Sequence, residues 1–189
     1  MKTLICGPMY SGKSTALFQR LERLLFARKK VLLIRPKKDT RGYFTHSGGV
    51  DLNKLEEKYP QQFVILEMKT FEPVDIKDII ADEFDAVFVD EYFMIPGIHH
   101  ICHQNTFDVY FSGLLATSEC ELCTEAVKIL PYCDKIKKLN AVCMDCGSEL
   151  GSYSFADFEK TSEVVVGDAK YRCLCQKCYE KAMENKTTK

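Results

Sequence analysis

Short apolar runs alternate with a helical pattern along the first two-thirds of the chain. Strands are predicted for the apolar runs at 3–6, 30–35, 63–66, 85–90 and 108–113. The run at 85–90 is almost continuously apolar, which is typical of a strand buried on both faces of a parallel sheet. Between the first two runs, apolar residues repeat at helical spacing and predict a helix over 17–28. Strands that alternate with helices predict an α/β fold, a parallel sheet flanked by helices.

The pattern changes near Leu139. Beyond this residue, cysteines, glycines, aromatic residues and short alternating stretches replace the regular strands and helices. We therefore expect two parts, an α/β domain over 1–139 and a small lobe over 140–189. The last residues, 184–189, are all polar and predict a disordered tail.

A phosphate-binding loop follows the first predicted strand. The G-x-x-x-x-G-K-S pattern is formed by Gly7, Pro8, Met9, Tyr10, Ser11, Gly12, Lys13 and Ser14. In such loops backbone N–H groups surround the phosphates, the lysine reaches the β- and γ-phosphates, and the serine hydroxyl binds Mg²⁺. A glycine-rich turn before an ordinary helix is the alternative interpretation. The position between a predicted strand and a predicted helix favours nucleotide binding and a P-loop NTPase-like sheet.

Two carboxylates, Asp90 and Glu91, follow the apolar residues of the strand predicted over 85–90. At the carboxyl edge of a parallel sheet, Asp90 can face the Mg²⁺ held by Ser14, and Glu91 can act as a general base beside the γ-phosphate. An acidic loop after a strand is common, so the pair alone does not indicate a functional role. Its occurrence together with the phosphate loop favours one. The two motifs predict phosphoryl transfer without choosing between water and a substrate hydroxyl as the acceptor.

Composition narrows the class of protein. The 189 residues carry 26 basic and 27 acidic side chains, and a net charge of −1 gives no field that would attract nucleic acid or a membrane surface. No apolar run is long enough for a membrane-spanning helix. The chain enters its first strand directly, with no room for a secretory signal, so we expect a cytoplasmic protein.

The cysteines predict a metal site. In a reducing compartment, paired cysteines among the 10 present are more often zinc ligands than disulfides. Two C-x-x-C pairs, Cys143 with Cys146 and Cys175 with Cys178, can face each other and complete a tetrahedral site. Four thiolates leave no open position, so the zinc should be structural. The competing cysteines are Cys173 and a third C-x-x-C pair, Cys120 and Cys123, which we expect within a helix over 119–127.

With these motifs in order, the chain resembles the zinc-containing, type II class of thymidine kinases nearly end to end. The matching segments are Gly7 to Thr15, Lys38 to Arg41 with Thr45 and His46, Asp90 with Glu91, Leu139 to Cys146, and Val165 to Tyr171 followed by Cys175 to Tyr179. The resemblance implies a P-loop domain and a zinc lobe that carries a loop closing over the substrate. It also implies a homotetramer, and thymidine and ATP as the small molecules bound.

The resemblance further implies a role for each matching residue. Glu91 would deprotonate the 5′-hydroxyl, while Lys13, Ser14, Thr15 and Asp90 would hold ATP and Mg²⁺. Arg41 would contact the transferring phosphate, and Tyr171 would stack on the nucleoside. Met9 would line the floor of the pocket, and Ser154 would lie near the base. The edge of the base would be read by the main chain of Val164, Val165, Val166 and Gly167.

The expected function is therefore ATP-dependent phosphorylation of thymidine, or deoxyuridine, at the 5′-hydroxyl, a nucleotide salvage step. The chain departs from the family pattern at Phe93, Ser112 and Leu115. These departures leave open a deoxynucleoside kinase with a different base preference. A catalytically weak paralogue that binds nucleotide or assists assembly is a third hypothesis. A zinc ribbon that binds nucleic acid fits least, because the lobe has no marked excess of basic residues.

Overall fold

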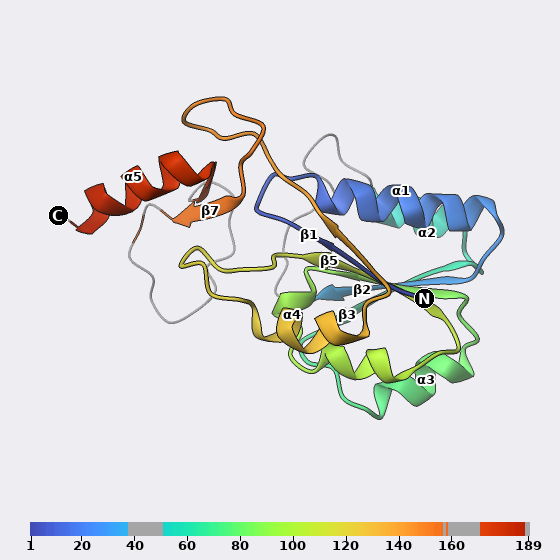
Figure 1. Cartoon of the computed structure of the whole chain (residues 1–189). Coiled ribbons are helices and arrows are strands. Elements are labelled where there is room, and N and C mark those ends of the chain that lie inside the picture. Colours follow the sequence, from blue (N-terminus) through green and yellow to red (C-terminus); the bar gives the residue numbers. More distant parts are fainter. Residues whose placement is uncertain (38–50, 157, 159–170, 188–189) are drawn as a thin grey trace.

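The computed structural model describes residues 1–37, 51–156, 158 and 171–187, and consists of an α/β domain and a small C-terminal lobe (Figure 1). The α/β domain contains a parallel sheet with strand order β3-β2-β4-β5-β1-β6. These strands are β1 (Lys2–Cys6), β2 (Val31–Pro36), β3 (Phe63–Met68), β4 (Ala86–Asp90), β5 (Asp108–Gly113) and β6 (Lys135–Lys138). The predicted α/β class and the predicted strands are confirmed.

Helices cover both faces of this sheet (Figure 1). One face carries α1 (Lys13–Phe26) and α2 (Leu52–Lys58), and the other carries α3 (Asp75–Ala81) and α4 (Thr124–Ile129). Short 3₁₀ turns complete the second face: η1 (Tyr92–Met94), η2 (Ile98–His103) and η3 (Leu130–Tyr132). Within the described ranges, no helix is both long enough and apolar enough to cross a lipid bilayer.

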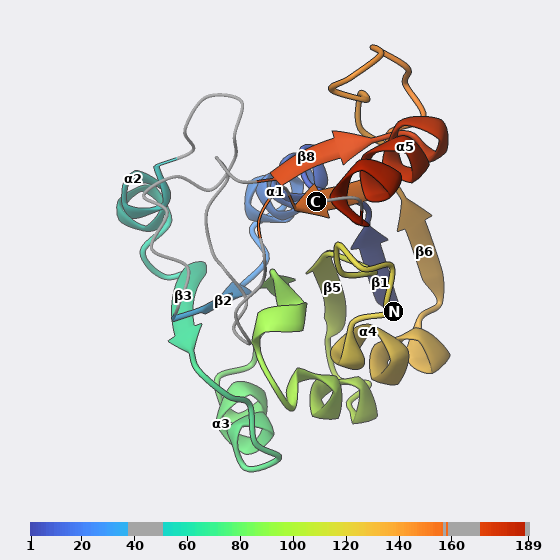
Figure 2. The ribbon, with the colours of Figure 1, turned by 90° about the vertical axis from the view of Figure 1, so that its left-hand side faces the viewer.

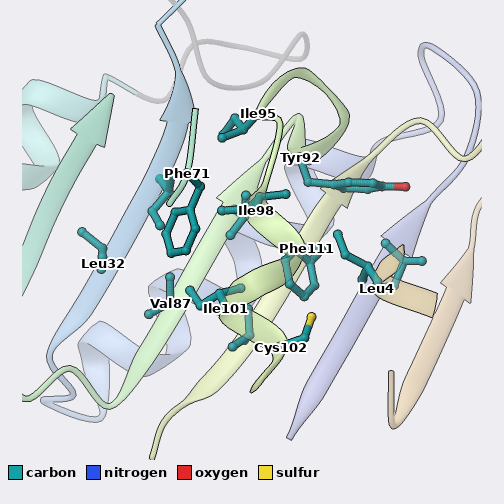
Figure 3. Close-up of a cluster of buried hydrophobic side chains, with 14 of the residues drawn as sticks. Leu4, Leu32, Phe71, Val87, Tyr92, Ile95, Ile98, Ile101, Cys102 and Phe111 are labelled. Atoms are coloured by element: carbon teal, nitrogen blue, oxygen red, sulfur yellow. The ribbon is translucent and has the colours of Figure 1, made fainter. Parts of the chain in front are cut away.

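Each face of the sheet has its own apolar core. On the α1 face, Leu17, Leu21 and Leu25 are fully buried at helical spacing against the strands. On the other face, Tyr92, Ile95 and the residues of η2 pack on β1, β4 and β5 (Figure 3). Every residue of β4 is buried, as its continuous apolar sequence predicts. In the outer strand β3 only Phe63 is buried, and the other residues are half-buried or exposed.

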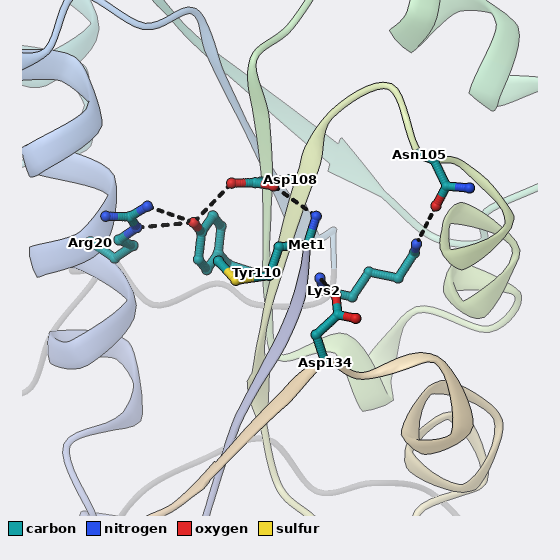
Figure 4. Close-up of polar contacts among 7 residues, drawn as sticks. All are labelled: Met1, Lys2, Arg20, Asn105, Asp108, Tyr110 and Asp134. Atoms are coloured by element: carbon teal, nitrogen blue, oxygen red, sulfur yellow. Dashed lines mark hydrogen bonds and ion pairs between the residues drawn. The ribbon is translucent and has the colours of Figure 1, made fainter.

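Polar contacts fix α1 and the first strand to the sheet (Figure 4). The Arg20 guanidinium donates to the Tyr110 hydroxyl at 2.8 Å, and this hydroxyl donates to Asp108 at 3.3 Å. Asp108 also accepts from the amino group of Met1 at 2.8 Å. At the far edge, the backbone N–H of Lys2 donates to Asp134 at 2.6 Å. The helix that follows the phosphate loop is therefore tied to the central strand β5.

The C-terminal lobe contains a two-stranded antiparallel sheet, β7 (Tyr153–Ala156) with β8 (Tyr171–Leu174), and helix α5 (Gln176–Thr187) (Figure 2). Its small core is formed by Cys143, Phe155, Leu174 and Tyr179. The Tyr179 hydroxyl donates to the backbone oxygen of Ser118 at 2.7 Å, which ties the lobe to the loop before α4.

The predicted first helix is confirmed with shifted ends. It spans Lys13–Phe26 rather than 17–28, because Gly12 adopts a left-handed conformation at its N-cap and the helix can begin directly after it. Two local predictions were wrong. No helix spans 119–127: α4 begins at Thr124, and Cys120 lies in a turn with a positive φ of 63°. The expected polar tail is helical as far as Thr187, because α5 packs on the lobe and Lys186 donates to the backbone oxygen of Ala156 at 3.0 Å.

Candidate active site

The phosphate loop connects β1 to α1 at the carboxyl edge of the sheet, and its two glycines serve different purposes. A Cβ atom at Gly7 would lie 2.4 Å from the backbone oxygen of Leu139 and 2.7 Å from the Ser11 hydroxyl. Gly12 has open space around it but adopts a left-handed φ of 78°, which glycine populates without strain. Gly7 is therefore required by close packing, and Gly12 by backbone conformation.

Side chains inside the loop stabilise its shape. The Lys13 ammonium is buried and donates to the backbone oxygen of Pro8 at 2.7 Å. The Ser11 hydroxyl donates to the same oxygen at 2.9 Å. The lysine is thus held across the loop, beside the N-terminus of α1, where backbone N–H groups and the helix dipole favour a phosphate.

Ser14 and Asp90 lie together, as the two sequence motifs predict. The Ser14 hydroxyl donates to an Asp90 carboxylate oxygen at 3.5 Å, and Asp90 is only 1% exposed. Mg²⁺ prefers oxygen ligands, and this pair supplies a hydroxyl and a carboxylate beside the phosphate loop. The donor set therefore fits Mg²⁺ as the ion that would accompany a bound nucleotide.

Glu91 follows directly and has an unusual backbone. Its φ of 48° and ψ of 46° place it in the left-handed region, where a residue with a Cβ atom is strained. The next side chain, Tyr92, is fully buried, and its hydroxyl donates to the backbone oxygen of Leu114 at 2.7 Å. Because Tyr92 is anchored, it fixes the backbone of the turn and therefore the position from which the half-buried Glu91 side chain extends. Residues strained in this way cluster at functional sites.

Two predicted substrate-binding residues meet at the junction between the domain and the lobe. The backbone N–H of Met9 donates to the Ser154 hydroxyl at 3.1 Å, and Ser154 is buried on β7. Tyr171 begins β8, pairs with Ala156 on β7 and packs its ring edge-on against Phe158, with ring centres 5.4 Å apart. The predicted residues Arg41, Val164, Val165, Val166 and Gly167 lie outside the described ranges.

The positions that depart from the family pattern lie in different environments. Phe93 and Leu115 are partly buried and pack against the apolar cluster on the α4 face of the sheet. Ser112 lies beside Asp90, at the carboxyl end of β5. Only Ser112 is therefore a direct neighbour of the Ser14 and Asp90 pair.

The four predicted zinc ligands converge in the lobe. The sulfur atoms of Cys143, Cys146, Cys175 and Cys178 all lie within 4.8 Å of one another. Burial by itself raises the pKa of Cys143, but hydrogen bonds from the backbone of Cys175, Asp145 and Cys146 outweigh it and lower that pKa to about 6. Four thiols from two C-x-x-C pairs at this mutual distance match the ligand set of a structural zinc site, so the cluster fits this metal. Cys120, in its exposed turn, is not part of the cluster.

Some functional contacts could not be predicted from the sequence. The bond from Met9 to Ser154 joins residues 145 positions apart. The approach of Leu139 to Gly7 depends on β6 lying beside β1, where the N–H of Leu139 donates to the oxygen of Cys6 at 2.7 Å. Gly7, Met9 and Leu139 lie in the matching segments, but the sequence carries no signal that pairs them with their partners.

Comparison with known proteins agrees with this geometry. Residues 2–179 match the family model described as thymidine kinase. The chain is 31% identical over 182 residues to a thymidine kinase of raccoon poxvirus, covering 93% of this chain and 94% of that protein. It is 29% identical to a thymidine kinase of Bacteroides fragilis, covering 96% and 87%, and 29% identical to the cytosolic thymidine kinase of Gallus gallus, covering 93% and 75%. The chain therefore belongs to the thymidine kinase family.

Proposed function

We propose that this protein transfers the γ-phosphoryl group of ATP to the 5′-hydroxyl of thymidine, and of deoxyuridine, in a nucleotide salvage reaction. The observation that carries the proposal is the convergence of Lys13, Ser14, Asp90 and Glu91 at one edge of the sheet. Family membership supports a nucleoside as the acceptor. Water that reached the γ-phosphate would hydrolyse ATP without phosphorylating the nucleoside. Kinases of this type therefore close over their substrates and exclude water.

In this mechanism the protein positions its substrates and removes one proton. Backbone N–H groups of the phosphate loop and the Lys13 ammonium bind the β- and γ-phosphates. Glu91 accepts the proton of the 5′-hydroxyl as its oxygen attacks the γ-phosphorus, and the bond from that phosphorus to the leaving ADP oxygen breaks. Mg²⁺ held by Ser14 and Asp90 would neutralise charge that develops on the phosphates.

The lobe supplies the nucleoside side of the site. Tyr171 offers a ring on which a base can stack, and Met9 with Ser154 forms the floor of the pocket next to the phosphate loop. We assign Arg41 to the transferring phosphate and the main chain of Val164, Val165, Val166 and Gly167 to the edge of the base. A structural zinc ion on the four cysteines would stabilise the lobe that carries Ser154 and Tyr171.

Assembly and location complete the proposal. The outer strand β6 leaves its four residues exposed, including Ile136 at 56%, which supports self-association of the sheet edge in a homotetramer. Measurement of the mass in solution by light scattering tests this assignment. Zinc held by thiolates is typical of reducing compartments, so we place the enzyme in the cytoplasm, acting on small molecules rather than on nucleic acid or membranes.

A phosphotransfer assay tests the proposed function. Purified protein with Mg²⁺ and γ-labelled ATP is offered thymidine, deoxyuridine, deoxycytidine, deoxyadenosine, deoxyguanosine or water alone. We expect thymidine 5′-monophosphate as the main product, with at least about tenfold discrimination in kcat/KM against deoxycytidine, because its N3 and amino group would mispair with a site built for thymine. Faster phosphorylation of another base would show a different specificity, and release of phosphate without a nucleoside product would show an ATPase.

A further inference from the structure

Ser112 combines complete burial with an unsatisfied hydroxyl. The residue is 0% exposed, and its Oγ has no hydrogen-bond partner among the described residues. Burying a hydroxyl without a partner costs stability, and an alanine would fill most of the same space. The other buried positions along β5 are held by Val109, Tyr110, Phe111 and Gly113, and none of these carries a buried side-chain polar atom without a partner.

Its place in the sheet puts Ser112 at the centre of the site. β5 lies between β1, which leads into the phosphate loop, and β4, which ends at Asp90. In register, Ser112 is the direct neighbour of Asp90 on one side and of Ile5 on the other. Because strands are parallel and in register, paired residues point to the same face.

The pair two residues earlier shows this alignment directly. Phe88 of β4 and Tyr110 of β5 stack on the α1 face with ring centres 4.7 Å apart. Side chains of a strand repeat every second residue, so Asp90 and Ser112 face the same side, toward the start of α1. There the Asp90 carboxylate already accepts the Ser14 hydroxyl.

We propose that Ser112 is a positioning residue for the metal-binding carboxylate. When Mg²⁺ and nucleotide are bound, the Ser112 hydroxyl donates to one Asp90 oxygen and leaves the other directed toward the ion and Ser14. A carboxylate has enough acceptor sites for both partners, and an outer hydrogen bond of this kind orients a ligand and tunes the metal. This inference rests on the proposed function only in assigning Mg²⁺ to Ser14 and Asp90.

Thr3 provides a matched control. Its Oγ1 is also buried without a hydrogen-bond partner in the described structure, on the adjacent strand β1. Thr3 pairs with Tyr110, which lies two residues before Ser112 on β5. Thr3 therefore lies away from Asp90. Thr3→Val removes a buried unsatisfied hydroxyl just as Ser112→Ala does, but away from the metal-binding residues.

The experiment compares wild type, Ser112→Ala and Thr3→Val by two measurements that need no turnover. Without metal and nucleotide, thermal unfolding should show that both variants are at least as stable as wild type. Binding of Mn²⁺, followed by electron paramagnetic resonance in the presence of a non-hydrolysable ATP analogue, should weaken about tenfold in Ser112→Ala and stay unchanged in Thr3→Val. Binding of the analogue without metal should be the same in all three.

Unchanged Mn²⁺ affinity in Ser112→Ala would overturn the proposal. A loss of unliganded stability in Ser112→Ala but not in Thr3→Val would also overturn it, because the hydroxyl would then be structural. Neither measurement includes a nucleoside, so failure of thymidine phosphorylation and failure of the Ser112 assignment are distinguishable.

Discussion

Individual backbone conformations set the geometry of the phosphate loop and the end of β4. Tyr10 in the loop has a φ of 63°, and Glu91 after β4 has a φ of 48°, both in the left-handed region. Such residues persist only where the surrounding structure determines them, here the buried Lys13 on one side and the anchored Tyr92 on the other. Two of the described non-glycine residues with positive φ thus lie among the residues assigned to phosphate binding and proton transfer, whereas Arg28, Glu83 and Cys120 lie in turns elsewhere.

The two loop glycines should respond differently to alanine. Gly7→Ala places a methyl group 2.4 Å from a backbone oxygen that cannot easily move, so we expect displacement of the loop and loss of ATP binding. Gly12→Ala meets no atom and should cost only the strain of a left-handed alanine, about 1–2 kcal/mol. Thermal unfolding and nucleotide binding of the two variants check this. Equal loss of ATP binding in both would contradict the packing explanation.

At the scale of elements, Glu125 ties α4 to the turn before η2. It is 5% exposed and accepts from the backbone N–H groups of Gly97 and His99, each at 3.2 Å, and from the His99 ring at 2.8 Å. Burial raises the pKa of Glu125, but these hydrogen bonds outweigh it and hold the pKa below its usual value. The carboxylate therefore stabilises the fold in its ionised form.

Glu125→Gln should destabilise the protein by about 1–3 kcal/mol at neutral pH, because an amide cannot satisfy the same donors. Since the folded pKa is lowered, this stabilisation is present above the unfolded pKa and is lost as pH falls through the folded pKa. The difference in melting temperature between wild type and variant should therefore narrow below about pH 4. Glu57→Gln on the exposed surface of α2 is the control and should change little. A pH-independent difference would show that the charge is not involved.

The four-cysteine cluster is the feature of the lobe that fits a structural zinc ion. Wild-type protein should contain about one zinc ion per chain, and Cys143→Ser should lose it and unfold the lobe at lower temperature. Cys120→Ser removes an exposed thiol outside the cluster and should keep the metal. Metal analysis by mass spectrometry distinguishes the two variants. Equal zinc loss from Cys120→Ser would mean that the ligand set is wrong.

At the scale of the whole molecule, hydrogen bonds join the lobe to two different loops of the α/β domain. Ser154 accepts from Met9 of the phosphate loop at 3.1 Å, and Tyr179 donates to Ser118 at 2.7 Å. The ring of Tyr179 also stacks on Tyr153, with centres 4.8 Å apart. The lobe is therefore positioned directly against the loop to which phosphate binding is assigned.

Tyr179→Phe should lower stability by about 1 kcal/mol, because it keeps the stacked ring but leaves the Ser118 oxygen without this donor. A looser lobe should also raise KM for the nucleoside more than KM for ATP. Tyr132→Phe, at an exposed tyrosine, is the control and should change neither property. An unchanged melting temperature in Tyr179→Phe would show that this bond does not hold the lobe.

The features that could be predicted from the sequence are those that local patterns of residues determine. The apolar runs placed the sheet strands up to β5, and the motif spacing placed Lys13, Ser14 and Asp90 correctly at one edge. The helix expected around Cys120 was wrong because residues of good helical propensity lie in a turn fixed by contacts to the lobe. Strand β6 and the Met9 to Ser154 bond depend on distant partners, for which the local pattern carries no information.

Single-turnover transfer by Glu91→Gln tests the central claim most directly. Glutamine keeps the shape of the side chain but cannot accept the proton of the 5′-hydroxyl, and loss of a general base typically lowers a rate about 10²–10⁴-fold. We therefore expect transfer from ATP to thymidine to fall by about that factor, with ATP affinity and melting temperature close to those of wild type. A variant that retains more than about a tenth of the wild-type rate would contradict the assignment of Glu91 as the base.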